Sequence, residues 1–189
     1  MAQKTGYVRA SEISAKGLPR VALTRLVRAG KLIRQARGLY TLPDRNITEY
    51  ESMVEICARY PNVVVCLLSA LRYHEITTQA PFEVWIAVAF KARKPKSDYP
   101  PVRVVRFSDK LLEIGVERHE ISGIEVRITS VTRTVADCFR YRNKIGIDVA
   151  LEALRDAWTG NRIDLNQLWH LAGLMRIASV IRPYMESLT

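Results

Sequence analysis

The apolar positions near the start of the chain repeat with helical spacing. Over residues 19–29 they form one stripe at positions i, i+1, i+4 and i+5, namely Ala22, Leu23, Leu26 and Val27. Residues 11–17 predict a shorter helix, with Ser11 as N-cap and Gly17 as its stop, and Gly30 ends the second helix. Two short helices joined by a tight turn are typical of a helix-turn-helix.

Two β-prone runs follow these helices directly. They cover residues 31–35 and 39–43 and are joined by Ala36-Arg37-Gly38, so they predict a β-hairpin. A hairpin placed immediately after a helix-turn-helix is a wing, and the combination predicts a winged helix-turn-helix over residues 1–46.

The pattern after residue 46 changes from one helix to strands and then to helices. A capping box of Thr48 and Glu51 predicts a helix with a buried stripe of Tyr50, Met53, Val54 and Cys57. Residues 62–68 fit either a buried strand or the lead into a helix near 69–74. Predicted strands cover residues 82–89, 102–107, 116–121 and 124–129, the last two joined by Ser122-Gly123 as a hairpin.

Helical patterns then run to the end of the chain. The predicted helices cover residues 131–139, a segment capped by Asp148, a segment capped by Asp164 with Gln167, and one from about Met175 that Pro183 kinks. Strands followed by helices predict an α+β domain over residues 47–189. The expected fold class is therefore α+β, with an N-terminal winged helix-turn-helix.

Charge divides the chain at the same place. The chain has 29 Lys and Arg against 19 Asp and Glu, a net charge of +10. Residues 1–46 carry ten basic and two acidic side chains, a net charge of +8, and the remainder carries only +2. Such an excess in one segment favours a polyanionic partner and predicts double-stranded DNA.

The predicted second helix turns a polar face away from its apolar stripe. From this face Arg20, Thr24, Arg25 and Arg28 are expected to enter the major groove, where guanidinium groups fit guanine edges. Arg37 at the hairpin tip, with Arg34 beside it, is expected to touch phosphates or the minor groove, and Lys31 is a further expected DNA contact. Arginine-rich helix faces also occur in proteins that touch no DNA, but the arginines of the hairpin and the scarcity of acids favour DNA.

A second basic run lies in the larger domain. The segment 91–96 follows a predicted strand and holds no acid, and it predicts a loop with secondary phosphate contacts through Lys91, Arg93, Lys94 and Lys96. Solvation of such a run is the alternative. Arg140, Arg142 and Lys144 are similar, although Arg133, Asp137 and Arg140 are spaced to pair along one helix face.

The sequence lacks the constellations that catalysis requires. It has no phosphate-binding loop, dinucleotide fingerprint or nucleophile elbow, and His74, His119 and His170 are isolated from other ligands. We therefore expect no enzyme, no cofactor and no metal site. A metal-dependent nuclease with a DNA-targeting arm stays open as an alternative, with candidate carboxylates Glu83, Asp98, Glu113, Glu117 and Glu125. A protein-interaction module for an acidic partner is the other alternative.

Composition places the chain among globular proteins. Hydrophobic residues make up 48% of it, and no apolar run approaches the length of a membrane span. The first residues lack the apolar core of a secretory leader, so a cytoplasmic location with no membrane partner is expected. The three cysteines are far apart among apolar residues, which predicts reduced thiols.

The chain resembles the AbiEi-type antitoxins, the regulator halves of type IV toxin–antitoxin pairs that act in abortive infection. The resemblance runs through residues 26–32 (LVRAGKL), 37–43 (RGLYTLP) and 67–74 (LLSALRYH), and its most specific part is residues 130–146 (SVTRTVADCFRYRNKIG). It implies a winged helix that binds inverted repeats in its own promoter and represses the operon. It also implies a C-terminal antitoxin domain that counters a nucleotidyltransferase-like toxin, with or without a direct complex.

One feature departs from the pattern of this family. Its members usually have a full helix before the segment that corresponds to Gly6-Tyr7-Val8, whereas only five residues precede it here. Without that helix, Leu23, Leu26 and Leu32 are expected to need cover from the 47–189 domain or from another copy of the chain.

Overall fold

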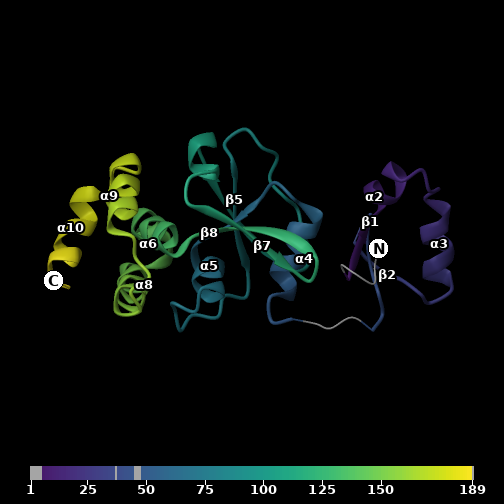
Figure 1. The fold of residues 1–189 in the computed structure, drawn as a ribbon, viewed down its shortest axis with the longest axis horizontal. Helices are drawn as coiled ribbons and strands as arrows, with labels where there is room; N and C mark the ends of the chain where they lie inside the picture. Colours follow the sequence, from purple (N-terminus) through teal and green to yellow (C-terminus); the bar gives the residue numbers. More distant parts are fainter. Residues whose placement is uncertain (1–5, 37, 45–47, 189) are drawn as a thin grey trace. The chain divides into compact units, whose positions relative to one another are not determined.

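The computed structural model describes residues 6–36, 38–44 and 48–188 (Figure 1). The chain forms two compact units. The first reaches to Asn62 and includes Arg118–Val126, and the second contains Val63–Glu117 and the chain from Arg127 onward. The two units are described separately below.

A small antiparallel sheet organises the first unit. Its strands are β1 (Tyr7–Arg9), β2 (Ile33–Ala36) and β3 (Leu39–Thr41), in the order β1-β3-β2. The helices α2 (Ala10–Ala15) and α3 (Val21–Arg28) lie between β1 and β2 in the chain. This order of strand, two helices and hairpin is that of a winged helix-turn-helix, as the sequence predicts.

The ends of the two helices follow partly from local sequence. Gly17 and Gly30 come just after them with φ of +74° and +68°, a backbone conformation that glycine adopts readily, so both predicted stops are confirmed. The predicted N-cap of α2 is wrong. Arg9 holds that position instead of Ser11, because the carboxylate of Glu12 accepts the backbone N–H of Arg9 at 3.3 Å.

A compact apolar cluster joins α3 to the sheet. Val8, Leu23 and Leu32 are buried, and the partly buried side chains around them come from α2, α3, β3 and their flanks, namely Ala10, Ile13, Val27, Tyr40 and Leu42. Neighbours within residues 8–42 therefore cover Leu23 and Leu32, and the predicted need for cover from elsewhere is wrong for these two. Leu26 remains 38% exposed, so it lies at the margin of the predicted stripe.

The face of the small sheet that points away from α3 packs against the next helix, α4 (Glu51–Arg59). Successive strand residues point to opposite faces, so Tyr7 and Arg9 point away from the side of Val8. The Tyr7 hydroxyl donates to Glu51, and Arg9 Nε donates to the Ala58 carbonyl oxygen at 2.7 Å. α4 thus belongs to the same unit as the winged helix.

The predicted cap of α4 is wrong. Tyr50 is the N-cap, and the buried hydroxyl of Thr48 has no hydrogen-bond partner among the described residues. The predicted buried stripe is nearly complete, because Met53, Val54 and Cys57 are buried and Tyr50 is half-buried.

The larger sheet has five strands in the order β6-β5-β4-β8-β7. They are β4 (Val64–Val65), β5 (Val84–Ala89), β6 (Val102–Phe107), β7 (Val116–Ile121) and β8 (Ile124–Thr129). β4 is antiparallel to β5 and parallel to β8, and β5 is parallel to β6. The predicted strands 102–107, 116–121 and 124–129 are confirmed, and both alternatives for residues 62–74 are realised, because α5 (Leu67–Tyr73) directly follows β4.

Helices make up the rest of the second unit. They are the short 3₁₀ helix η1 (Asp109–Leu112), α6 (Val131–Arg140), α7 (Arg142–Ile145), α8 (Ile147–Thr159), α9 (Leu165–Leu174) and α10 (Ala178–Glu186). Of these, α6, α8, α9 and α10 form one group (Figure 1). α6 packs against α5, α8 and α9. Asp164 caps α9 by accepting the Gln167 N–H at 3.0 Å, as predicted, whereas the N-cap of α8 is Gly146 and not Asp148. The α+β class is confirmed.

The centre of α6 holds a buried ion pair. Arg133 Nε lies 2.9 Å from Asp137 Oδ2, and neither side chain is exposed at all. Arg133 also donates to the carbonyl oxygens of Leu111 and Ile114 and lies over the Phe107 ring. The predicted pairing of these two residues along one helix face is confirmed.

Candidate nucleic-acid interface

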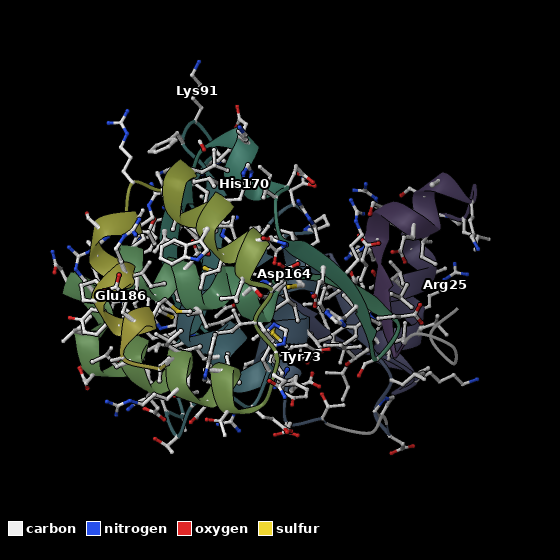
Figure 2. The ribbon with its side chains drawn as sticks, turned by 60° about the vertical axis from the view of Figure 1, so that its left-hand side comes forward. Arg25, Tyr73, Lys91, Asp164, His170 and Glu186 are labelled. Atoms are coloured by element: carbon white, nitrogen blue, oxygen red, sulfur yellow. The ribbon has the colours of Figure 1, made fainter. Side chains whose placement is uncertain are left out.

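The exposed face of α3 carries the residues expected to read DNA. Thr24, Arg25 and Arg28 are exposed and, with Val21, follow the spacing i, i+3, i+4 and i+7 of one helix face. Arg25 points into solvent (Figure 2). Neither Arg25 nor Arg28 forms an ion pair with any of the residues that the structure describes. Both guanidinium groups are therefore available to an external acceptor.

The hairpin adds further cations. Lys31 follows α3 directly and Arg34 lies on β2, and both are exposed. Arg34 pairs across the sheet with Tyr40, which pairs with Val8, so Arg34 lies on the same face of the sheet as α3. Arg37, the predicted contact at the hairpin tip, lies outside the described residues.

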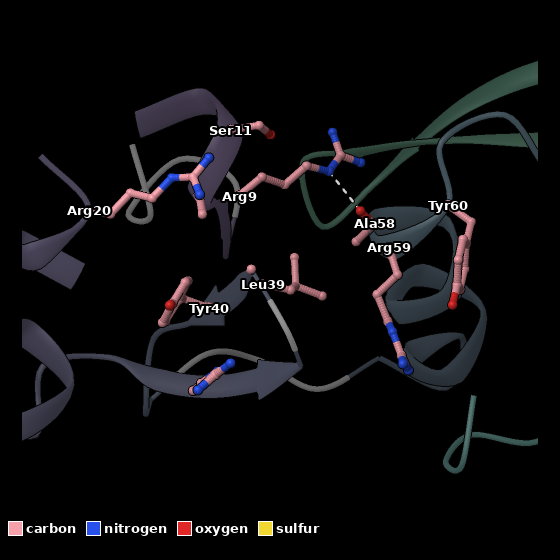
Figure 3. Close-up of a pocket in the computed structure, with 11 residues that line it drawn as sticks. Arg9, Ser11, Arg20, Leu39, Tyr40, Ala58, Arg59 and Tyr60 are labelled. Atoms are coloured by element: carbon pink, nitrogen blue, oxygen red, sulfur yellow. Dashed lines mark hydrogen bonds between the residues drawn. The ribbon is translucent and has the colours of Figure 1, made fainter. Parts of the chain in front are cut away.

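A groove of about 620 Å³ opens beside these elements within the first unit (Figure 3). Arginines from four places line it, namely Arg9, Arg20, Arg34 and Arg59, together with Tyr40 and Tyr60. Arg20 is oriented by its Nε, which donates to Ser14 Oγ at 3.0 Å. The structure thus brings Arg20 and Arg34 to one groove, whereas Thr24, Arg25 and Arg28 are not among its lining residues.

The four arginines of the groove have different surroundings. Arg9 is held by Glu12 at 3.4 Å and by the carbonyl oxygens of Ala58 and Cys57 near the end of α4. Arg59 lies 3.6 Å from Glu55. Arg20 and Arg34 have no acidic partner within the described part of the chain. The groove therefore combines two fixed cations with two that can receive a phosphate, because guanidinium groups bind phosphate oxygens bidentately.

Sequence reasoning missed Arg59 and Tyr60 as members of this groove. They follow the predicted domain boundary, and no local pattern links α4 to a sheet more than ten residues earlier. Arg9 gives a weak signal for a packing partner of this strand. An arginine beside the buried Tyr7 and Val8 needs hydrogen-bond acceptors, and these can come from another element.

The basic run 91–96 forms a loop between β5 and β6, in the second unit. Its four predicted phosphate contacts, Lys91, Arg93, Lys94 and Lys96, are all exposed. Figure 2 shows Lys91 extending away from the fold.

Four of the side chains considered for catalysis have structural partners. His74 is buried, and its Nε2 lies 2.7 Å from the Thr129 carbonyl oxygen. Glu83, Glu113 and Glu125 form ion pairs with Arg103, Arg127 and Arg118. No group of three potential metal-ligating side chains was found among the described residues.

The three cysteines are buried free thiols, as predicted. Burial raises the pKa of the Cys57 thiol to about 12, and it raises the pKa of Cys66 and Cys138 as well. A thiol of raised pKa is a poor nucleophile, so these residues act as apolar core side chains. Within the described ranges, no helix has both the length and the apolar character needed to cross a bilayer.

Comparison with known proteins supports the fold and the N-terminal resemblance. The crystal structure of the RV2827C protein from Mycobacterium tuberculosis superposes with a TM-score of 0.56 at 15% identity, covering 88% of this chain and 66% of that one. This likeness concerns the fold alone, and this chain spans 66% of the length of that structure. No curated protein sequence matches the chain. Residues 2–43, which contain the helix-turn-helix and the hairpin, match the family described as "Transcriptional regulator, AbiEi antitoxin".

Proposed function

We propose that this chain is a DNA-binding transcriptional autorepressor and the antitoxin of a toxin–antitoxin pair. The observation that carries the proposal is the exposed, unpaired cationic face of α3 beside a basic hairpin, in a segment that matches a family of antitoxin regulators. In this proposal residues 1–46 form the DNA-binding domain and residues 47–189 the antitoxin and regulatory domain, with α4 bracing the winged helix.

In the proposed interface, one set of side chains contacts bases and another contacts phosphates. α3 enters the major groove, where Arg25 and Arg28 donate to base edges and Thr24 contacts a base or a phosphate. Arg20, Lys31, Arg34 and Arg37 hold the backbone on either side and fix the position of α3. The loop of Lys91, Arg93, Lys94 and Lys96 would supply secondary phosphate contacts.

The proposed operator is an inverted repeat in the promoter of the chain's own operon. An inverted repeat presents two equivalent half-sites, so two copies of α3 would occupy major grooves about 34 Å, or one helical turn, apart. Repression then follows because the bound pair covers the promoter.

A binding assay with the upstream intergenic DNA tests this function. We expect specific binding at 50–100 mM salt, and each of Arg25→Ala and Arg28→Ala should weaken it by roughly 1–3 kcal/mol where that side chain holds a base edge bidentately. Arg155→Ala is the matched control, because Arg155 is an exposed arginine of α8 in the second unit. It removes the same charge and should leave the preference for the operator over scrambled DNA unchanged.

Two results would contradict the proposal. One is the absence of binding to the intergenic DNA at low salt. The other is an unchanged sequence preference in both Arg25→Ala and Arg28→Ala, which would remove α3 as the reading element.

The antitoxin role needs a separate assay. Co-expression of the chain with an adjacent gene product of the nucleotidyltransferase-like class should restore growth that the latter alone arrests. Pull-down of that product would show whether a direct complex forms. Growth arrest that persists at full expression of the chain would contradict the antitoxin role and leave DNA binding untouched.

A further inference from the structure

The loop between β5 and β6 combines cations with exposed aromatic side chains. Phe90 is 60% exposed and Tyr99 is 75% exposed, and they bracket the basic run 91–96. Phe82, just before β5, is 82% exposed. Single exposed apolar side chains are ordinary, but three exposed aromatic rings around four cations in one region call for a binding role.

The fold holds this loop in place. One terminal guanidinium nitrogen of Arg106, on β6, lies 2.8, 2.6 and 2.9 Å from the carbonyl oxygens of Ala89, Phe90 and Ala92, so its two N–H groups are shared among these three acceptors. Within the loop, Pro95 and Pro100 are buried. Phe90 therefore projects from an anchored backbone, which lowers the entropy that a ligand must remove on binding.

The strand register determines how far apart the exposed aromatic rings lie. β5 and β6 are parallel, with Val84 opposite Val102, so Phe82 and Tyr99 precede their strands at one end of the pair. Phe90 follows β5 at the other end. A six-residue strand rises about 20 Å, so the basic loop links aromatic rings separated by roughly that distance.

A groove of about 560 Å³ is lined by residues of β5, β6 and the loop. Lys94, Arg103 and Lys144 line it, with Trp85 and one carboxylate, Glu83. Arg103 neutralises that carboxylate at 2.8 Å and lies over the Trp85 ring with 5.7 Å to its centre. Lys94 and Lys144 therefore leave the groove positively charged.

We propose that this surface binds single-stranded nucleic acid. Lysine and arginine side chains of the loop and groove would hold successive phosphates, and unpaired bases would stack on Phe90, Tyr99 and Phe82. Cationic grooves bordered by stacking rings are how proteins bind single strands without sequence preference. A duplex keeps its bases stacked inside, so it would use the cations and leave the rings unused.

This site goes beyond the proposed promoter binding and does not depend on it. It lies in the second unit, on residues that α3 does not contain. Arg25→Ala with Arg28→Ala should therefore leave single-strand binding unchanged, so the two proposals can fail separately.

Fluorescence anisotropy with the full-length protein tests the site. The probes are a fluorescein-labelled 12-mer of uridine and a 12-mer of thymidine, with a self-complementary hairpin of equal phosphate number for comparison. We expect at least fivefold tighter binding to a 12-mer than to the hairpin at 50 mM salt. The ratio between the two 12-mers shows whether RNA or DNA is preferred.

Two matched double variants separate stacking from apolar contact. Phe90→Leu with Tyr99→Leu keeps apolar volume without an aromatic face, and it should weaken single-strand binding about fivefold or more for each ring, since base stacking is the term removed. Phe90→Trp with Tyr99→Phe keeps both rings and should remain within about twofold of the parent. Lys94→Ala with Arg93→Ala should weaken both kinds of probe and flatten the salt dependence.

Three outcomes would overturn the proposal. They are no measurable single-strand binding at 50 mM salt, equal binding of the leucine and parent proteins, and tighter binding to the hairpin.

Vesicles of phosphatidylcholine and phosphatidylserine complete the test. Binding to these vesicles that the leucine variant loses, without binding to either 12-mer, would assign the surface to anionic membranes and overturn the proposal.

Discussion

Removal of the buried carboxylate of Asp137 should destabilise the second unit strongly. Asp137→Ala leaves the guanidinium of Arg133, which has no exposed surface, without its counter-charge. Breaking a buried pair from one side costs about 3–5 kcal/mol. Arg133 keeps the carbonyl oxygens of Leu111 and Ile114 at 3.0 and 2.6 Å, so we expect the lower end, about 3 kcal/mol.

Urea unfolding followed by tryptophan fluorescence measures this loss. The three tryptophans of the chain, Trp85, Trp158 and Trp169, all lie in the second unit, so their signal reports its unfolding. At about 2 kcal/mol per M of urea, the midpoint should fall by about 1.5 M.

Glu113→Ala is the control within the same unit. Glu113 pairs with Arg127 at 2.7 Å, but its side chain is 68% exposed, so its loss should cost less than about 1 kcal/mol. Equal, small shifts of the midpoint for both variants would refute the reasoning, because they would mean that the unpaired Arg133 reaches water or another acceptor.

Two further predictions concern packing and burial. Gly115→Ala should lower the urea midpoint, because φ is +65° and a Cβ would lie 2.9 Å from that of Arg133, whereas Gly173→Ala, on an open helix surface, should raise stability by about 0.5–1 kcal/mol. Thiol titration should find no fast-reacting cysteine in the native protein and three after denaturation, and a fast native thiol would contradict the burial of Cys57, Cys66 and Cys138.

Elements with a local signal could be predicted from the sequence. The β7–β8 hairpin is one, because runs of alternating apolar and polar residues flank Ser122 and Gly123. Both of these residues adopt positive φ, as a two-residue hairpin turn requires. The Asp164 cap is another, since the carboxylate and the N–H that it accepts are three residues apart. The exposed face of α3 could also be predicted, because helical spacing places Thr24, Arg25 and Arg28 on the side opposite the buried Leu23.

Features that depend on distant partners could not be predicted. Arg9 becomes the N-cap of α2 and binds the end of α4, and neither role is visible in the residues around it. Arg59 joins Arg20 and Arg34 at one groove only because α4 packs on the small sheet. The burial of Glu55 at 4% exposed is similar, because its partners Arg59 and Gln35 come from two elements.

The salt dependence of duplex binding tests the α3 interface most directly. If roughly six to eight phosphates are neutralised, a plot of log affinity against log salt should have a slope of about −5 to −7. Removing Arg20 and Arg34 together should make that slope shallower by about two, because each is assigned to a phosphate and each lost cation releases one fewer counterion. A slope that is the same in the parent, in this double variant and in Arg155→Ala would contradict a duplex interface on α3 and the hairpin.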